Sequence, residues 1–301
     1  MARPTEKLVI ALGGHGERKL DGIADHDLGE FGKQLAARGF RLRTLNLAVV
    51  PDVPKNTSVM VISSPRSELT EGEVDKVLAY VARGGSILWL VDQGSLYGLQ
   101  PLAEKLELTL TPGVVIDPQA RQLRTPETFS IGTHYGHHAV TRNFDYLTVF
   151  PFARQIAISE NGEWRSISLV EAGQGGWVET GKLDSGIAFD PMYDVAGPVC
   201  IAAALSRTSN EREQRIAVIG SGHFLANAYL GRGKNLDFGL NLVNWLAGDE
   251  TFIMIQPRTT LDNSLALEER TLPLIAWVVL VAMPLIFAAS GGIIWWKRRR
   301  N

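Results

Sequence analysis

Apolar and polar positions alternate in blocks through the first hundred residues. Four blocks have the pattern of strands: residues 7–12, 41–47, 58–63 and 87–91. The first, third and fourth are continuous apolar runs, typical of strands buried on both faces of a parallel sheet. Between the first two blocks, Leu28, Phe31 and Leu35 recur at helical spacing and predict a helix. Gly39 ends it.

A second helix is predicted from the capping-box sequence Thr70-Glu71-Gly72-Glu73. Apolar residues follow at helical spacing from Val74 to Val81, and Gly84-Gly85 ends the helix. Residues 99–106 have a third helical pattern. Strands that alternate with helices predict an α/β fold, a mostly parallel sheet with helices on both faces.

The pattern changes between about residues 117 and 194. Clustered histidine, glycine and aromatic residues lie here, and weak strand-like alternation occurs over residues 146–150 and 164–170. We expect an inserted β-rich segment with short antiparallel strands and long loops.

The core pattern returns after this insertion. Residues 199–205 and 215–219 have the pattern of two more core strands, residues 236–246 that of a helix, and residues 252–255 that of a last short strand. We therefore assign residues 1–255 to one soluble α/β domain, which is long enough to bury a proper core.

Residues 256–271 are polar, and we expect a juxtamembrane linker there. Residues 272–296 contain no Asp, Glu, Lys, Arg or His, and the cations Lys297–Arg300 follow directly. About twenty apolar residues in a helix cross a hydrocarbon core of about 30 Å. The sequence therefore predicts a C-terminal transmembrane helix over residues 272–296 and a basic tail over residues 297–301. A buried core helix is the alternative that we reject, because such helices rarely run this long without a charge.

The charges on the two sides of the predicted helix indicate its orientation. Four cations follow it, whereas Arg270 precedes it together with Glu268 and Glu269. Under the positive-inside rule the tail is cytoplasmic and the α/β domain is extracytoplasmic, at a bacterial inner membrane. No signal-peptide pattern opens the chain. We expect either an additional upstream span or a tail-anchored protein with a cytoplasmic domain, and the charge bias favours the first.

The composition excludes several classes of function. The chain has 301 residues, of which 45% are hydrophobic and 21% charged, and a formal net charge of −2. No basic excess argues for binding to nucleic acid. The single cysteine, Cys200, excludes an internal disulfide and a cysteine-rich metal site. It lies inside an apolar strand pattern, where we expect it to be buried and a poor nucleophile.

Glycine-containing loops follow three of the predicted strands, at Gly13–Arg18, Asp92–Gly94 and Gly220–Phe224. Ligands gather at the carboxyl ends of parallel strands, so these loops either present backbone N–H groups to a ligand or make tight turns only. The first loop lacks the third glycine of GxGxxG, and GxxxxGK[ST] does not occur in the chain. We expect no nucleotide and no other cofactor.

The candidate recognition residues are His15 and Glu17 after the first strand, and Ser221 and His223 after the strand at residues 215–219. If both strands are central and parallel, these side chains converge on one crevice. Imidazoles donate or accept hydrogen bonds, and Glu17 offers a charge to a basic partner. In the alternative reading, Glu17 only pairs with Arg18 or caps the next helix.

Metal binding and hydrolysis receive little support from the residues. His134, His137 and His138 have a spacing at which imidazoles share a metal, but their segment offers no nearby carboxylate or thiol. We expect a metal-free loop. Ser221 lies on a predicted tight turn, yet Ile219 replaces the first glycine of GxSxG. We therefore expect no catalytic residue.

Several weak motifs occur in an order that resembles one known family. They are Gly14-His15-Gly16-Glu17, Leu45-Asn46-Leu47, Gly84-Gly85 before Leu88-Trp89-Leu90, Asp117-Pro118, and Asn235-Leu236-Asp237 leading to Leu242-Val243-Asn244-Trp245-Leu246. With the closing apolar segment and its Trp and Arg tail, the whole chain resembles the gliding-motility-associated auxiliary component of ABC transport systems.

The resemblance implies a non-ATPase, membrane-anchored binding or scaffolding subunit with an extracytoplasmic domain. It implies a flavodoxin-like or class I glutamine-amidotransferase-like α/β fold. The implied partners are the ABC permease and ATPase, membrane lipid, and another auxiliary subunit or a small ligand. The family usually has a further span upstream and acidic residues in the loop where this chain has Ser221, Gly222 and His223. No catalytic residues are established for it.

From these observations we expect an auxiliary subunit of a bacterial ABC transport system, not an enzyme. Two alternatives remain open. One is a membrane-anchored hydrolase of the amidotransferase-like fold. The other is a tail-anchored cytoplasmic adaptor.

Overall fold

The computed structural model describes residues 7–159, 162–173, 175–181, 183, 187–209, 212–248, 280–281 and 283–300. The chain divides into two compact units, Met1–Ile255 and Gln256–Asn301, which we describe separately. The predicted strand at residues 252–255 and the linker at residues 256–271 lie outside the described residues.

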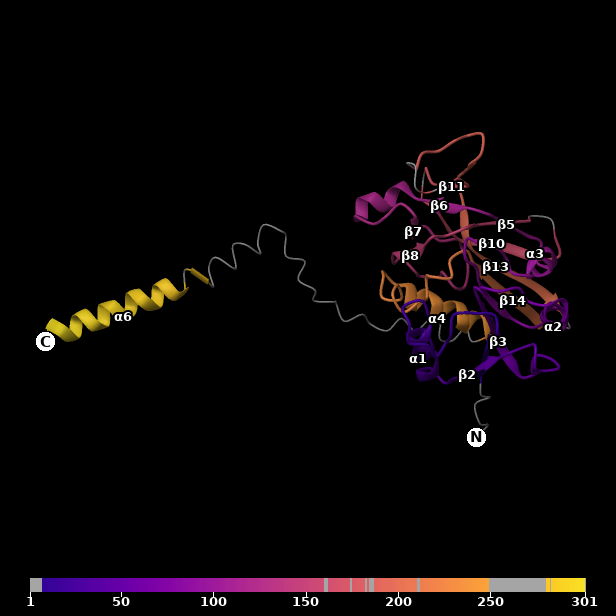
Figure 1. The fold of residues 1–301 in the computed structure, drawn as a ribbon, viewed down its shortest axis with the longest axis horizontal. Helices are drawn as coiled ribbons and strands as arrows, with labels where there is room; N and C mark the ends of the chain where they lie inside the picture. Colours follow the sequence, from indigo (N-terminus) through magenta and orange to yellow (C-terminus); the bar gives the residue numbers. More distant parts are fainter. Residues whose placement is uncertain are drawn as a thin grey trace. The chain divides into compact units, whose positions relative to one another are not determined.

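A seven-stranded sheet forms the centre of the first unit (Figure 1). Its strands, from one edge to the other, are β2 (Phe40–Leu45), β1 (Lys7–Leu12), β3 (Thr57–Ser63), β4 (Ile87–Leu90), β14 (Arg212–Ile219), β13 (Cys200–Ser209) and β10 (Arg165–Glu171). Neighbouring strands from β2 to β14 pair in parallel. This part of the sheet has the strand order of doubly wound, flavodoxin-like proteins, in which the order reverses between β1 and β3.

Helices cover both faces of the sheet, as predicted. On one face, α1 (Gly29–Ala37) and α4 (Asn235–Leu246) bury Phe31 and Phe238 against Val9, Val61 and Leu88. On the other face, α2 (Glu71–Ala82) and α3 (Gln100–Lys105) pack against the alternate residues of the same strands. Because successive strand residues face opposite sides, both faces of each central strand must be apolar, which explains the continuous apolar runs.

The start of α2 confirms the predicted capping box. Glu73 Oε2 accepts a hydrogen bond from the Thr70 backbone N–H at 2.9 Å and from the Thr70 hydroxyl at 2.7 Å. The side chain of Glu73 is almost fully buried. The cap therefore fixes the first turn of α2 beside the loop that follows β1.

Short antiparallel strands fill much of the predicted insertion. They are β6 (Val114–Ile116), β7 (Phe129–Gly132), β8 (Thr148–Pro151), β9 (Gln155–Ile158), β11 (Trp177–Glu179) and β12 (Val195–Ala196), with a 3-10 helix at Pro118–Leu123. β7 pairs with β8, β9 pairs with β5 (Leu108–Thr111), and β6 and β12 flank β11.

One strand differs from the sequence-based expectation, and the direction of a second was not predicted. β10 lies within the predicted insertion, yet it forms an edge of the main sheet and pairs antiparallel with β13. β13 in turn runs antiparallel to β14, with Ser209 opposite Arg212 in the register of the two strands. Weak alternation indicated β10 and apolar composition indicated β13. The apolar composition of β13 did not indicate its direction, since parallel and antiparallel strands in the middle of a sheet are equally buried.

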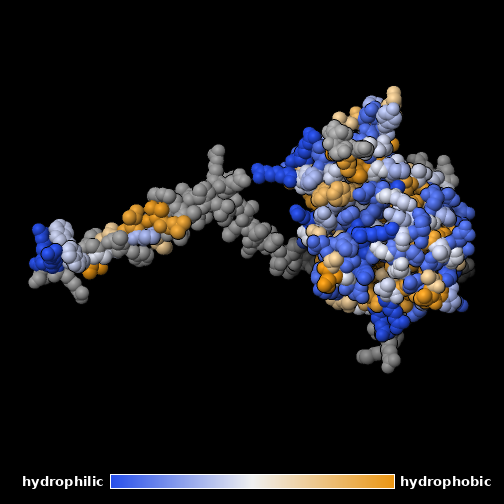
Figure 2. Space-filling view, in the orientation of Figure 1, coloured by the Kyte–Doolittle hydropathy of each residue, from blue (hydrophilic) through white to orange (hydrophobic). Residues whose placement is uncertain are grey.

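The second unit contains α6 (Met283–Arg300), with apolar side chains along it and hydrophilic ones at its basic end (Figure 2). Its 18 residues include the four cations Lys297–Arg300. In the ranges that the structure describes, no helix is both long and apolar enough to cross a membrane. Residues 272–279 and 282 of the predicted span lie outside those ranges.

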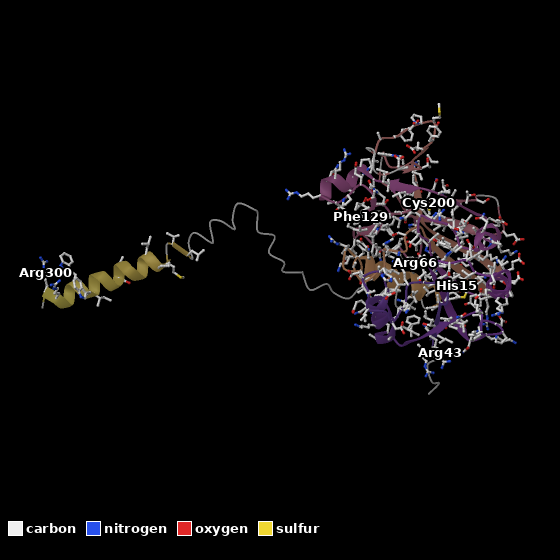
Figure 3. The ribbon with its side chains drawn as sticks, viewed as in Figure 1. His15, Arg43, Arg66, Phe129, Cys200 and Arg300 are labelled. Atoms are coloured by element: carbon white, nitrogen blue, oxygen red, sulfur yellow. The ribbon has the colours of Figure 1, made fainter. Side chains whose placement is uncertain are left out.

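Cys200, which Figure 3 labels, opens β13. It is partly rather than fully buried. Burial raises the pKa of its thiol to about 11, so the sulfur stays protonated at neutral pH and is a poor nucleophile. We expect Cys200→Ala to fold normally and to lower the free energy of unfolding by about 1 kcal/mol, because only a small contact is lost. Urea unfolding followed by tryptophan fluorescence measures this loss, and a value above about 3 kcal/mol would contradict it.

Candidate functional site

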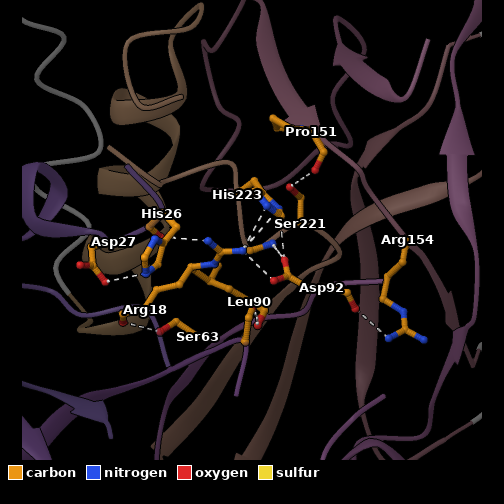
Figure 4. Close-up of polar contacts among 12 residues, drawn as sticks. Arg18, His26, Asp27, Ser63, Leu90, Asp92, Pro151, Arg154, Ser221 and His223 are labelled. Atoms are coloured by element: carbon orange, nitrogen blue, oxygen red, sulfur yellow. Dashed lines mark hydrogen bonds and ion pairs between the residues drawn. The ribbon is translucent and has the colours of Figure 1, made fainter. Parts of the chain in front are cut away.

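The carboxyl ends of β1, β3, β4 and β14 lie at the same edge of the sheet, because these strands are parallel. The loops that leave this edge carry Arg18, Ser64, Asp92 and His223. Figure 4 shows the side chain of Arg18 reaching from the first loop to Asp92 and His223. The polar groups of the candidate site come together here.

A cation, a carboxylate and an imidazole contact one another at the centre of this edge. Arg18 Nη2 donates to Asp92 Oδ2 at 2.7 Å and lies 3.4 and 3.3 Å from the two ring nitrogens of His223. His223 Nδ1 lies 3.3 Å from Asp92 Oδ1, which also accepts the Gly222 backbone N–H at 3.0 Å. Asp92 therefore connects the loops after β1, β4 and β14.

The backbone of Arg18 is held as firmly as its side chain. Its N–H donates to the Ser63 carbonyl at 3.1 Å, and the Ser63 hydroxyl donates to the Arg18 carbonyl at 2.8 Å. Nη1 donates to the His26 carbonyl at 2.9 Å. The side chain is only 1% exposed. Because a buried guanidinium needs a counter-charge, the Asp92 carboxylate is what allows Arg18 to lie here.

Asp92 is ionised over the whole physiological pH range. Burial opposes ionisation, but the hydrogen bond from His223 and the charge of Arg18 outweigh it and lower the pKa of Asp92 to about 2. Its side chain is 28% exposed. The carboxylate is thus a permanent charge that borders a cavity.

Two further residues shape this edge. The Cβ of any side chain at Gly222 would overlap Ser64 Oγ and Asp92 Oδ1, so only glycine fits there. Arg154, which is 1% exposed, donates to the carbonyls of Asp92 at 2.9 Å, Gly94 at 3.1 Å and Leu110 at 2.7 Å. Burial lowers the pKa of Arg154, although the nearby Asp92 charge opposes this. Arg154 fixes the loop after β4.

His15 and Glu17 form a second polar group on the same edge. Glu17 Oε2 accepts the His15 backbone N–H at 2.7 Å, and the His15 ring lies 3.6 Å from Glu17 Oε1 and 3.3 Å from Glu73 Oε2. Glu17 therefore contacts His15. It does not pair with Arg18, whose carboxylate partner is Asp92, and it does not cap α1. Burial opposes ionisation of Glu73, but its hydrogen bonds to Thr70 and the charge of His15 lower the pKa of Glu73.

The structure places the four predicted site residues in different surroundings. His223 borders a cavity of about 350 Å³ together with Ser64, Arg66, Asp92 and Tyr97. Glu17 borders a separate cavity of about 460 Å³, lined by the end of β1, the loop after it and Thr44 of β2. Ser221 borders neither, because it is fully buried and its hydroxyl donates to the Pro151 carbonyl at 2.7 Å.

The two cavities are separated by a direct contact. Gly16 lines the second cavity, Arg66 lines the first, and the Arg66 side chain packs against Gly16. The Arg66 backbone N–H also donates to the His15 carbonyl at 2.7 Å. Figure 3 shows His15 and Arg66 close together. We call the cavity lined by Ser64, Arg66, Asp92, Tyr97 and His223 the strand-end cavity.

Sequence reasoning missed Arg18, Asp92 and Arg154 as individual residues. Two of them stand in loops that the glycine pattern marked, since Arg18 ends one and Asp92 begins another. Their position directly after buried strands was the available signal. Arg154 lies between β8 and β9 and no local pattern distinguishes it.

The histidine cluster of the insertion has structural contacts. His138 Nδ1 accepts the Val140 backbone N–H at 3.2 Å, and its ring packs edge-on against Trp245. Burial lowers the pKa of His138 to about 4. Within the described ranges, no group of three or more His, Cys, Asp or Glu side chains is arranged to hold a metal ion.

Comparison with protein families identifies one match. The model of the ABC_transp_aux family, described as ABC-type uncharacterized transport system, matches residues 6–254. No curated protein matches the chain. The match covers the sheet, all the loops of the candidate site and the insertion.

Several solved structures are similar in fold. The mmIFT52 N-terminal domain is 15% identical, with a TM-score of 0.60, and the similarity covers 79% of this chain and 97% of that one. It shows the fold alone. The exo-β-1,4-mannosidase Op5Man5 from Opitutaceae bacterium strain TAV5 is 8% identical with a TM-score of 0.37, covering 81% and 35% of the two chains. A thuA-like protein from Parabacteroides merdae ATCC 43184 is 12% identical with a TM-score of 0.46, covering 80% and 89%. The last two similarities are too weak to carry an argument.

The ion pair leads to a pH-dependent prediction for Asp92→Asn. At pH 7 the variant should lose about 3 kcal/mol of unfolding free energy, because Arg18 stays buried without its counter-charge. The pKa of Asp92 is lowered to about 2 in the folded chain, so its ionised form stabilises the fold above about pH 4, by roughly 2 kcal/mol. This part is lost as the pH falls through about 2, and the difference between wild type and variant should narrow from pH 4 to pH 2.

Urea unfolding across this pH range measures the difference. The control is Asp52→Asn, which removes an exposed pair with Arg83 and should cost less than about 1 kcal/mol. Equal losses for the two variants, or a difference that stays constant with pH, would contradict the role of Asp92.

Proposed function

The chain belongs to the ABC_transp_aux family of ABC-type transport systems, and from this premise we propose that it is a membrane-anchored, non-ATPase subunit that recognises a ligand or partner. The family indicates an auxiliary component of such a system. We place recognition at the carboxyl edge of the sheet. The observation that carries this proposal is the buried Arg18–Asp92 pair beside the strand-end cavity.

Three features of this edge support binding. Open parallel sheets bind ligands at the carboxyl ends of their strands, near the point where the strand order reverses. Here the strand order reverses between β1 and β3, and β3 ends at this edge. The charged Arg18 there is fixed by hydrogen bonds, so little conformational freedom is lost when a ligand binds. Ser64 and Tyr97, which line the cavity, have positive φ angles of 50° and 48° although neither is glycine. Such strained backbone concentrates at functional sites.

The hydrolase of the amidotransferase-like fold remains the second candidate, and the geometry favours it less. Ser221 is buried, and its hydroxyl donates a hydrogen bond to the Pro151 carbonyl. The Ser64 hydroxyl donates to the Leu90 carbonyl at 3.3 Å, and neither serine is hydrogen-bonded to His223. A serine nucleophile needs a base within hydrogen-bond reach.

We propose a bacterial inner-membrane location, with the α/β domain extracytoplasmic and a gliding-motility-like role. The apolar run at residues 272–296 and the cations after it support an anchor with a cytoplasmic tail. In this arrangement the permease and ATPase are the partners, the anchor docks on the permease, and the α/β domain meets a ligand or a further subunit.

Co-purification tests the proposed assembly. After mild detergent extraction of the tagged full chain, we expect an ABC permease and its ATPase to be recovered in comparable amounts, as identified by mass spectrometry. An extract from cells that carry the untagged chain is the control. A tagged chain that is recovered without either subunit would contradict the proposal.

Single-cysteine labelling tests the orientation, because the chain has one cysteine. In a Cys200→Ala background, Val49→Cys reports on the α/β domain, since Val49 is 79% exposed, and Asn301→Cys reports on the tail. A membrane-impermeant maleimide should label position 49 in intact spheroplasts and position 301 only after lysis, as the positive-inside rule requires. The reverse pattern would establish the cytoplasmic adaptor instead.

A further inference from the structure

The chemistry of the strand-end cavity points to the class of ligand that it takes. We propose that it binds a small hydroxylated anion, a carboxylate or phosphate ester, with Arg66 as the counter-charge. This inference rests on the proposed function, because it names the ligand of the same subunit. It concerns the cavity beside His223 and not the separate cavity beside Glu17.

The lining of the cavity contains the cation Arg66 and the carboxylate Asp92, and Asp92 is already paired with Arg18, which lies outside the lining. Asp92 is the carboxylate of the lining, and its two oxygens are already occupied by Arg18, by His223 and by the Gly222 N–H. Arg18 and Asp92 therefore cancel. Arg66 is left, with an exposed side chain that makes no hydrogen bond or ion pair within the described part of the chain. An unpaired guanidinium at the lining of a cavity favours an anion, and its planar fork suits carboxylate and phosphate groups.

The other polar groups of the lining require more than a bare ion. Ser95, Tyr97 and His223 supply donors beside Arg66. Gln93 supplies an acceptor: its Oε1 is buried and has no hydrogen-bond partner among the described residues. A buried carbonyl oxygen without a partner costs free energy unless a ligand donates to it. The ligand should therefore carry a hydroxyl or another donor besides its negative group.

The size of the cavity sets the size of the ligand. Its volume is about 350 Å³, near the lower end of small-molecule sites. Leu96, Leu99 and Val91 form an apolar part of the wall against which a carbon chain can pack. A six-carbon polyol with one anionic group meets all these conditions.

The test uses the purified full chain and three matched probes: D-sorbitol, D-gluconate and D-sorbitol 6-phosphate. They share a six-carbon polyol and differ in bearing no charge, a carboxylate or a phosphate. Isothermal titration calorimetry should show that at least one anion binds ten times or more tightly than sorbitol, and the tighter anion identifies the preferred group. Its affinity should fall as sodium chloride is added.

The matched variants are Arg66→Gln and Arg43→Gln. Arg66→Gln should weaken binding of the preferred anion roughly ten- to hundredfold, the effect of losing a charge-assisted hydrogen bond. Arg43 is an exposed cation on the edge strand β2, away from Arg66 in Figure 3, and its loss should leave the affinity unchanged. Equal effects of the two variants would overturn the inference.

Two other results would also overturn it. One is sorbitol that binds as tightly as both anions, and the other is no binding by any probe at about 10 mM, ten times a Kd of about 1 mM, which corresponds to only about −4 kcal/mol. Co-purification of Arg66→Gln with the permease keeps the two proposals distinct. If anions fail to bind but the permease is still recovered, the ligand class is wrong and the proposed function stands. If the permease is lost from the wild type as well, the proposed function itself fails.

Discussion

The ion pair between the buried Arg18 and the partly exposed Asp92 is the interaction on which the carboxyl edge of the sheet depends. The two residues are 74 positions apart, and the pair joins the loop after β1 to the loop after β4, while Gly222 and His223 add the loop after β14. A charge that is removed from water is tolerated only when it is paired, so none of these loops can move independently. The strand-end cavity lies beside the pair, and Asp92 and His223 are part of its lining.

Much of this architecture is visible in the sequence, and the reason is physical. Strands such as Lys7–Leu12 and Thr57–Ser63 are apolar along most of their length because helices cover both faces of the sheet. Thr70 and Glu73 mark the start of α2 through local hydrogen bonds. The strand ends also follow from topology, so the loops that carry the site were predictable. The direction of β13 was not, because antiparallel and parallel central strands bury the same residues.

The inward-facing side chains of the loops were the part that sequence could not specify. His15, Glu17 and His223 share an edge, yet the packing of Arg66 against Gly16 separates them into two cavities. The buried Ser221 donates a hydrogen bond to the Pro151 carbonyl and lines neither cavity. Which charged residue of a loop turns inward depends on partners 74 and 205 residues away, and one sequence holds no record of such pairings. The fixed positions of these side chains are the basis on which we propose recognition at this edge.

A double-mutant cycle on Arg18 and Asp92 tests this account most directly. The free energies of unfolding of wild type, Arg18→Gln, Asp92→Asn and the double variant give the coupling between the two side chains. If the pair organises the edge, removing the second partner after the first should cost little, and the coupling should exceed about 1 kcal/mol. Losses that add to within about 0.5 kcal/mol would contradict the account, because they would show that Arg18 and Asp92 act independently.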